Sequence, residues 1–250
     1  MFRISQTVKV IIVANILFYI GSLSLGEGSY YIFAMHYPLN DSFYFWQVIT
    51  SMFMHDISGI GHILFNMIML LFFGSDLERF LGQKKFLFLY FSAGLGATGL
   101  ALLINYLGFL PGYNAMLELG FTPDQILEQL RSGYIDTGIY DYVAKDTIES
   151  MYRSYYTVSV GASGAIFGLL AAFAVQFPNE PLFLIIFPVP IKAKYLIGAY
   201  FALNVISAFS GTAFIGAENT GFWAHVGGGV IGFIVMWYWK KNSFDNKRLY

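Results

Sequence analysis

Long apolar runs alternate with short polar segments along most of this chain. A helix needs about 20 residues, at a rise of about 1.5 Å each, to cross the apolar core of a bilayer. Six runs are long enough, and they lie near residues 8–25, 58–74, 85–107, 158–177, 194–211 and 221–239. A further apolar segment, 182–190, is short and holds two prolines, so we interpret it as an interfacial re-entry. The pattern predicts an all-α membrane protein with six transmembrane helices.

Composition supports this class and excludes several others. The chain has 250 residues, of which 57% are hydrophobic and 12% charged, with a mean hydropathy of +0.60, which fits no ordinary soluble domain. No small-residue cleavage site follows the first run, so we expect a retained anchor. The chain has no cysteine, which excludes disulfides, thiolate catalysis and Cys-based zinc sites. The net charge of −1 says nothing about a nucleic-acid partner, and no basic patch with interleaved aromatic residues indicates one.

The basic residues predict the orientation, because lysines and arginines in short loops stay on the cytoplasmic side. Eleven of the 14 fall in alternate connections and at both ends of the chain. They are Arg3, Lys9, Arg79, Lys84, Lys85, Lys192, Lys194, Lys240, Lys241, Lys247 and Arg248. The other three, Arg131, Lys145 and Arg153, lie in one long connection, 108–157. Both termini are therefore predicted to be cytoplasmic, with 108–157 on the outer side.

Polar residues inside the runs are few and informative. No Asp, Glu, Lys or Arg lies in the middle of a run, which argues against a proton-coupled transporter, an ion pump and an intramembrane aspartyl protease. The chain contains no HExxH motif, the usual zinc-binding sequence of a metalloprotease. His62, Ser163 and His225 each lie four or five residues from the outer end of a run, about 6–8 Å deep. Asn66 follows His62 by four residues, on the same helix face. Ser163 and His225 could act as nucleophile and general base, with donors from a third helix stabilising an oxyanion.

Small residues explain how such side chains could meet. Two GxxxG spacings, Gly164–Gly168 and Gly228–Gly232, lie in the runs that hold Ser163 and His225, and small faces let helix backbones come close. Each feature has an ordinary structural interpretation when taken singly: a membrane serine usually bonds a carbonyl one turn back, and GxxxG is common packing. Their matched depth on three helices favours the catalytic interpretation. His36 and His55 lie in or near the first outer loop, and we interpret them as structural or surface residues.

Three motifs carry a resemblance to a known family. They are GHILFN with His62 and Asn66, GASG with Gly161, Ser163 and Gly164, and AHVGGGVIG with His225, Gly228 and Gly232. In this order on alternate runs, they make the chain resemble a bacterial rhomboid intramembrane serine protease. The softer segments WQVITSMFMH and LERFLG also resemble the family, and the likeness covers nearly the whole chain except 108–157.

The resemblance implies a six-helix rhomboid bundle and a site within it. Ser163 and His225 would form a catalytic dyad, and His62, Asn66 and the Ser163 backbone N–H would form the oxyanion hole. The positions that would pack the helices at the site are Gly161, Gly164, Phe167, Gly228 and Gly232. The expected substrates are transmembrane segments of other proteins, cut near the outer face of a bacterial cytoplasmic membrane. The resemblance implies neither a cofactor nor a metal.

Two positions depart from the family's pattern. Phe167 stands where many relatives have a tyrosine; its ring can still stack on His225 but offers no hydroxyl. The family's Trp-Arg pair is absent from the first outer loop, so aromatic residues would have to anchor that loop instead. Those available are Tyr30, Tyr31, Phe33 and Trp46.

Other functions stay open at this point. A rhomboid-like protein without activity would bind and escort transmembrane clients, but such relatives have generally lost the serine, the histidine or both. A small-solute transporter could share the six-run layout by chance. Neither the substrate nor the oligomeric state is encoded in a readable motif.

The connection 108–157 predicts a folded insertion within one rhomboid domain, 1–250. FTPDQILEQLRSG has a helix start at Thr122-Pro123, a capping glutamine at Gln125 and a stop at Gly133. A second amphipathic pattern runs over 140–151, with Tyr142, Val143, Ile148 and Met151 on one side. The insertion either packs on the outer rim or caps the mouth of the site and gates substrates.

Overall fold

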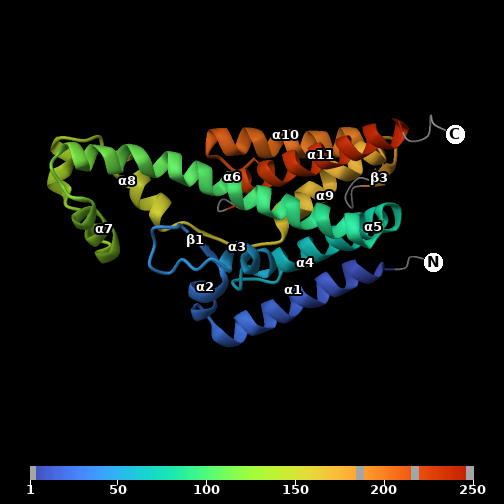
Figure 1. Ribbon diagram of the computed structural model, residues 1–250, viewed down its shortest axis with the longest axis horizontal. Helices are drawn as coiled ribbons and strands as arrows, with labels where there is room; N and C mark the ends of the chain where they lie inside the picture. Colours follow the sequence, from blue (N-terminus) through green and yellow to red (C-terminus); the bar gives the residue numbers. More distant parts are fainter. Residues whose placement is uncertain (1–3, 184–188, 215–219, 246–250) are drawn as a thin grey trace.

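The structure is a computed structural model that describes residues 4–183, 189–214 and 220–245. Its principal helices run nearly parallel and form an elongated bundle (Figure 1). They are α1 (Gln6–Leu25), α4 (Gly61–Met69) continued by the π-helical η2 (Leu70–Gly74) and α5 (Ser75–Leu81), α6 (Gln83–Glu118), α9 (Ser163–Gln176), α10 (Ala193–Ser210) and α11 (Phe222–Asp245). Among the described residues, α1, α6, α10 and α11 are long and apolar enough to cross a membrane, and α9 is a shorter apolar helix. The chain is thus mainly helical and built for a bilayer.

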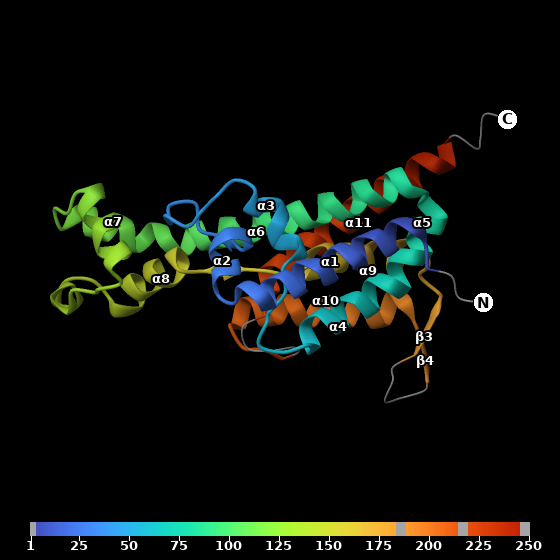
Figure 2. The ribbon, with the colours of Figure 1, turned by 90° about the horizontal axis from the view of Figure 1, so that it is seen from below.

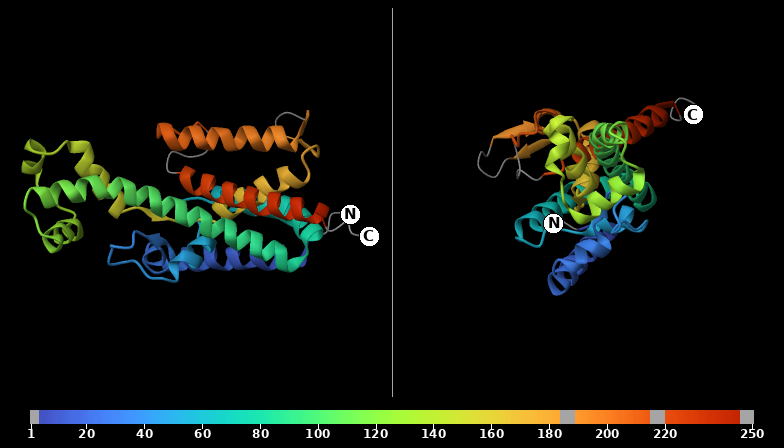
Figure 3. Two further views of the ribbon diagram at one scale, coloured as in Figure 1. Left: turned by 45° about the horizontal axis from the view of Figure 1, so that its top comes forward. Right: turned by 90° about the vertical axis from the view of Figure 1, so that its left-hand side faces the viewer.

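Three helices form the centre of the bundle. α9 packs against both α6 and α11, while α1 and α10 lie on opposite sides of them (Figure 3). A Cβ atom added to Gly228 would overlap the carbonyl oxygen of Gly164, and one added to Gly232 would overlap that of Gly168. These two GxxxG spacings therefore let α9 and α11 meet backbone to backbone.

Two helix boundaries differ from the sequence-based prediction. The fourth run was expected to be helical from about residue 158, but α9 begins at Ser163. Val158–Ser159 (β2) instead pairs antiparallel with Met35–His36 (β1). Gly161 has a φ of +126°, a backbone conformation that any residue with a side chain would adopt only under strain. α6 continues from 107 to 118, through Pro111, because its outer part packs on the insertion.

The N-terminal end of α1 is capped by a carboxylate from α5. Glu78 accepts hydrogen bonds from the backbone N–H groups of Thr7 and Val8, both at 3.0 Å, and from the hydroxyl of Ser5 at 2.5 Å. A carboxylate at this position satisfies N–H groups that a helix leaves free and complements its dipole. Glu78 thereby links α1 to the helix that carries His62.

The segment between α1 and α4 folds over the outer end of the bundle. It contains α2 (Gly28–Phe33), β1, α3 (Gln47–Thr50) and the 3₁₀ turn η1 (Ser51–Phe53). The side chain of Gln47 is fully buried: its Oε1 accepts from the N–H groups of Tyr44 (3.1 Å) and His36 (3.4 Å), and its Nε2 donates to the carbonyls of Tyr31 (3.0 Å) and Ser42 (2.7 Å). This glutamine holds the outer loop together.

The predicted insertion is folded against the C-terminal part of α6, at one end of the molecule (Figure 1). It consists of α7 (Pro123–Ser132), the 3₁₀ turn η3 (Thr137–Asp141) and α8 (Lys145–Tyr155). The predicted capping box of Thr122 and Gln125, with Pro123 at the start and Gly133 at the end, is confirmed. The second predicted helix begins later, at Lys145, because η3 occupies the preceding turn; Ile148 and Met151 are buried as expected, whereas Tyr142 is 78% exposed.

The segment between α9 and α10 contains a hairpin. β3 (Pro181–Phe183) pairs antiparallel with β4 (Pro190–Lys192), with Leu182 opposite Ile191, and it extends from the end of the bundle opposite the insertion (Figure 2). Within 182–190, Leu182, Phe183 and Pro190 are therefore in strands, while the interfacial position of the segment stays a prediction; 184–188 lie outside the described residues. Pro181 begins β3 and Pro190 begins β4, and the first residue of a strand is a position that proline tolerates.

Candidate active site

Three helix N-termini bring the candidate side chains together part-way along the bundle. His62 is the second residue of α4, Ser163 the first of α9 and His225 the fourth of α11. The extended segment before α9 carries the chain from the insertion into the bundle, so that this helix begins inside it (Figure 1). The similar depth that the sequence predicted for His62, Ser163 and His225 is therefore explained by their positions near the starts of α4, α9 and α11.

Ser163 and His225 are in direct contact. The Oγ atom of Ser163 lies 2.9 Å from Nε2 of His225, which is hydrogen-bond distance. His225 is 7% exposed, and its ring stacks on that of Phe167 with centroids 4.0 Å apart and planes 11° from parallel. The pair has the geometry that a hydroxyl nucleophile and its base require.

His62 of α4 lies near Gly161, two residues before Ser163. Its Nδ1 accepts a hydrogen bond from the Asp56 backbone N–H at 3.3 Å, so in the neutral ring the proton is on Nε2. A Cβ atom built on Gly161 would lie 3.3 Å from this Nε2 and 3.5 Å from Oγ of Ser163. His62 therefore presents a donor close to the serine hydroxyl.

Asn66 and the start of α9 add further donors nearby. Asn66 is 3% exposed, and its Nδ2 donates to the His62 carbonyl at 2.8 Å; the amide group has a second hydrogen for another acceptor. Ser163 begins α9, and a helix leaves its first N–H groups without acceptors inside the helix. Gly161, just before it, donates its N–H to the Ser51 carbonyl at 2.9 Å, which fixes the approach to the serine.

Asn204 contacts the candidate base, and sequence reasoning missed it. Its Oδ1 lies 2.8 Å from Nδ1 of His225, and its side chain is 1% exposed. In the sequence this asparagine was one of several polar residues in the fifth run. Only the register of α10 against α11 shows that it meets His225, and one sequence without the packed structure gives no such register.

The histidines of the outer segment are buried. His36 is 6% exposed and its Nε2 lies 3.0 Å from the Tyr30 carbonyl oxygen, while His55 is fully buried with its ring edge-on to that of His62, 5.2 Å between centroids. The structural interpretation is therefore correct for both, and the surface interpretation is wrong. Trp46 contributes to the loop as expected, donating from Nε1 to the Ile32 carbonyl at 2.8 Å.

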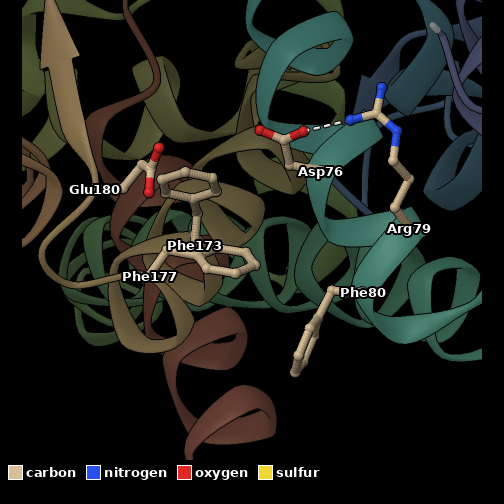
Figure 4. Close-up of a pocket in the computed structure, with 6 residues that line it drawn as sticks. All are labelled: Asp76, Arg79, Phe80, Phe173, Phe177 and Glu180. Carbon is tan, nitrogen blue, oxygen red and sulfur yellow. Dashed lines mark hydrogen bonds and ion pairs between the residues drawn. The ribbon is translucent and has the colours of Figure 1, made fainter.

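A pocket of about 390 Å³ lies elsewhere, between α5 and the end of α9. Figure 4 shows Asp76 paired with Arg79 beside Phe173, Phe177 and Glu180. It holds no candidate nucleophile and lies at the other end of α9 from Ser163. Within the described residues, no group of three or more His, Cys, Asp or Glu side chains could hold a metal ion.

Comparison with known proteins gives one family. A family model described as the rhomboid domain matches residues 42–118 and 130–242. A protein described as "Rhomboid protein 1, mitochondrial", from Saccharomyces cerevisiae, is 37% identical over 83 residues. That match covers 33% of this chain and 22% of the yeast protein. The gap in the family match, 119–129, contains the first part of α7.

Proposed function

Because the chain belongs to the rhomboid family, we propose that it is an intramembrane serine endopeptidase that cleaves transmembrane segments of other membrane proteins. The observation that carries this proposal is the 2.9 Å contact between Ser163 Oγ and His225 Nε2. The contact lies among three helix N-termini, with donors from α4 and α9 near it. Family membership makes protease activity the expectation, and the contact supports Ser163 and His225 as the residues that would carry it.

The geometry supports acyl transfer through Ser163. His225 Nε2 takes the proton from Oγ as Oγ bonds to the carbonyl carbon of the scissile peptide. The negative charge that develops on the carbonyl oxygen is stabilised by the Ser163 N–H, His62 Nε2–H and Asn66 Nδ2–H. His225 then gives its proton to the leaving amine as the C–N bond breaks. Water, deprotonated by the same nitrogen, hydrolyses the ester and restores Ser163.

The length of α9 supports access of water to the serine. Its 14 residues span about 21 Å, whereas the apolar core of a bilayer is about 30 Å thick. Its other end lies near the basic C-terminal part of α11, where Lys240 Nζ donates to the Val175 carbonyl at 2.7 Å. A helix that reaches the inner boundary would therefore begin well below the outer one, which would leave Ser163 within reach of water from the outer side.

The membrane arrangement is part of the proposal. The chain forms one rhomboid domain, with α4–η2 and α9 joining the four longer helices as six spans, α5 in the cytoplasmic connection, 108–157 as an outer insertion, and both termini on the cytoplasmic side of a bacterial membrane. α1 begins and α11 ends at the same end of the bundle (Figure 1), which supports placing both termini on one side of the membrane, and the basic residues make that side the cytoplasmic one. The cysteine-free chain allows a direct test, because single cysteines at Lys145 and Lys241 should differ in labelling by an impermeant maleimide in intact cells. Labelling at Lys241 instead of Lys145 would reverse the orientation.

A fluorophosphonate probe tests the proposed activity. The wild-type protein in detergent should label, and Ser163→Ala should not; His225→Ala should fail to label as well, and the double variant should be no worse, because the pair acts as one unit. Ser22→Ala, a buried serine of α1, is the matched control and should label normally. A folded wild-type protein that neither labels nor cleaves a single-span substrate would leave the alternative, a non-catalytic protein that binds transmembrane clients.

A further inference from the structure

Three asparagines are buried within the helices of the bundle, and all make the same local hydrogen bond. The Nδ2 atoms of Asn15, Asn66 and Asn204 donate to carbonyl oxygens four residues earlier, at 2.7, 2.8 and 2.9 Å. A carbonyl accepts only from the NH₂ side of an amide. This bond therefore fixes which way each amide points, and in Asn204 it turns Oδ1 toward α11.

The fixed amide of Asn204 determines the protonation of its neighbour. Its Oδ1 lies 2.8 Å from Nδ1 of His225, and an amide oxygen only accepts, so Nδ1 carries the hydrogen. In the neutral ring Nε2 is then free to accept, and that nitrogen faces Ser163 Oγ at 2.9 Å. Both Asn204 and His225 are buried, so bulk water does not compete for either bond.

The remaining contacts of the His225 ring fix its plane but not its proton. Phe167 stacks on one face at 4.0 Å, and the Phe222 ring approaches edge-on at 6.5 Å. Phe167 in turn contacts the Tyr200 ring at 5.0 Å. These apolar rings hold either tautomer equally well, whereas Asn204 accepts only from a protonated Nδ1.

We propose that Asn204 is a positioning residue that holds His225 in the tautomer able to deprotonate Ser163; this inference rests on the proposed function of the pair. When His225 takes the serine proton, Oδ1 of Asn204 continues to accept from Nδ1–H and stabilises the charged ring. A neutral amide does so without placing a carboxylate within the membrane, where an ionised group is costly. The site thus has a third member without an acidic side chain.

The competing interpretation is that Asn204 only fastens α10 to α11, as polar residues often do between membrane helices. Asn15 makes the same local bond on α1 without contacting His225, so Asn15→Leu is the matched control. Asn204→Leu keeps the size of the side chain and removes the acceptor, whereas Asn204→Asp keeps an acceptor oxygen. Each variant is compared with the wild type for thermal stability, probe labelling rate, and kcat and KM on a single-span substrate.

The positioning role predicts a particular pattern. Asn204→Leu should lower the labelling rate and kcat by about 10²-fold with KM nearly unchanged, less than the ~10⁴-fold loss for the orienting carboxylate of a Ser-His-Asp triad, because an amide carries no full charge. Asn204→Asp should recover much of this loss, and Asn15→Leu should show none of it. Near-normal labelling of folded Asn204→Leu, or an equal loss in Asn15→Leu, would overturn the proposal.

Nitrogen-15 NMR of the imidazoles tests the tautomer without depending on activity. The chain has four histidines, and His225→Gln identifies the signal of interest. A neutral His225 protonated on Nδ1 in the wild type, but not in Asn204→Leu, supports the assignment even if the wild type fails to label and the proposed function falls. The same tautomer mixture in both proteins overturns it even if Ser163 is reactive.

Discussion

Gly228 of α11 lies directly against Gly164 of α9, so that a Cβ atom on Gly228 would overlap the Gly164 carbonyl oxygen. Gly164 follows Ser163 in the chain, and Gly228 lies one turn beyond His225. The distance between the serine hydroxyl and the imidazole is therefore set by a backbone contact in which no side chain can yield. The packing motif and the proposed chemistry depend on the same few atoms.

Gly228→Ala should consequently damage both the packing and the site. The added methyl group must push the two helices apart, and overpacking of this kind costs about 1–3 kcal/mol or more. We expect a lower thermal midpoint and strongly reduced probe labelling of Ser163. Gly198→Ala on α10 is the control, because its Cβ would meet no atom within 4 Å. Normal labelling of Gly228→Ala would show that the contact does not set the dyad distance.

The donors around Ser163 should have graded effects. His62→Ala and Asn66→Ala are each expected to lower turnover by roughly 10–10³-fold, the usual range for one oxyanion donor. Labelling by a fluorophosphonate should remain detectable, because the serine and its base stay in contact. Turnover of a single-span substrate and labelling, measured on the same preparation, separate the two effects. Loss of folded protein in both variants would instead mean that these side chains mainly hold the bundle together.

Several features at the centre of this structure could be predicted from the sequence. Small residues at GxxxG spacing favour close helix packing, and the two spacings singled out in the sequence are those at which α9 and α11 meet. The capping box at Thr122 and the stop at Gly133 are local signals, and both are observed. Family membership, expected from three short motifs, is confirmed by the match over most of the chain.

What the sequence could not provide depends on contacts between distant segments. β1 and β2 pair residues 35–36 with 158–159, and this pairing delays the start of α9 to Ser163. Gln47 and Asn204 looked like ordinary polar residues, since their roles require knowing which carbonyl or imidazole lies opposite. α6 extends to Glu118 because its outer turns have a partner, the apolar cluster of the insertion.

The cap of α1 by Glu78 predicts a pH-dependent contribution to stability. Burial raises the pKa of Glu78, but hydrogen bonds from Ser5, Thr7 and Val8 outweigh it and hold the pKa below the ordinary value of 4.5. The unfolded chain therefore binds a proton at a higher pH than the folded protein does. This stabilisation is complete above about pH 4.5 and is lost as the pH falls through the folded-state pKa.

Glu78→Gln should accordingly lower the thermal midpoint most at neutral pH and least in acid. Hydrogen bonds to a charged group contribute about 1.5–3 kcal/mol to the stability of the folded protein. The neutral side chain introduced by Glu78→Gln should keep part of this stabilisation. Melting curves of the detergent-solubilised protein between about pH 3 and 7 measure the difference. Asp76→Asn, in an exposed ion pair with Arg79 on the same helix, is the matched control and should have little effect. A Glu78→Gln deficit that is independent of pH would contradict the cap.

The insertion contacts the outer loop through two polar links. Asn40 Nδ2 donates to the Tyr155 carbonyl at 3.2 Å, and Arg131 Nε lies 2.9 Å from Asp41 Oδ2. The Arg131–Asp41 pair is exposed, so it should contribute little. The insertion has its own apolar cluster, which Tyr37 of the outer loop joins. These contacts couple the insertion to the loop that precedes α3, whereas α7 lies at the far end of α6 (Figure 1).

This arrangement favours packing on the rim over a direct cap on the site. Replacing 119–144 with a Gly/Ser linker removes α7 and η3 but keeps α6, α8 and the β1–β2 pair. Because the apolar cluster of the bundle around α9 is separate from that of the insertion, we expect probe labelling of Ser163 and the relative cleavage rates on a panel of single-span substrates to stay nearly unchanged. Asp41→Ala, which breaks only the exposed link, should behave in the same way. A changed order of substrate preference in the linker variant, with labelling and thermal stability intact, would instead assign the insertion a role in choosing substrates.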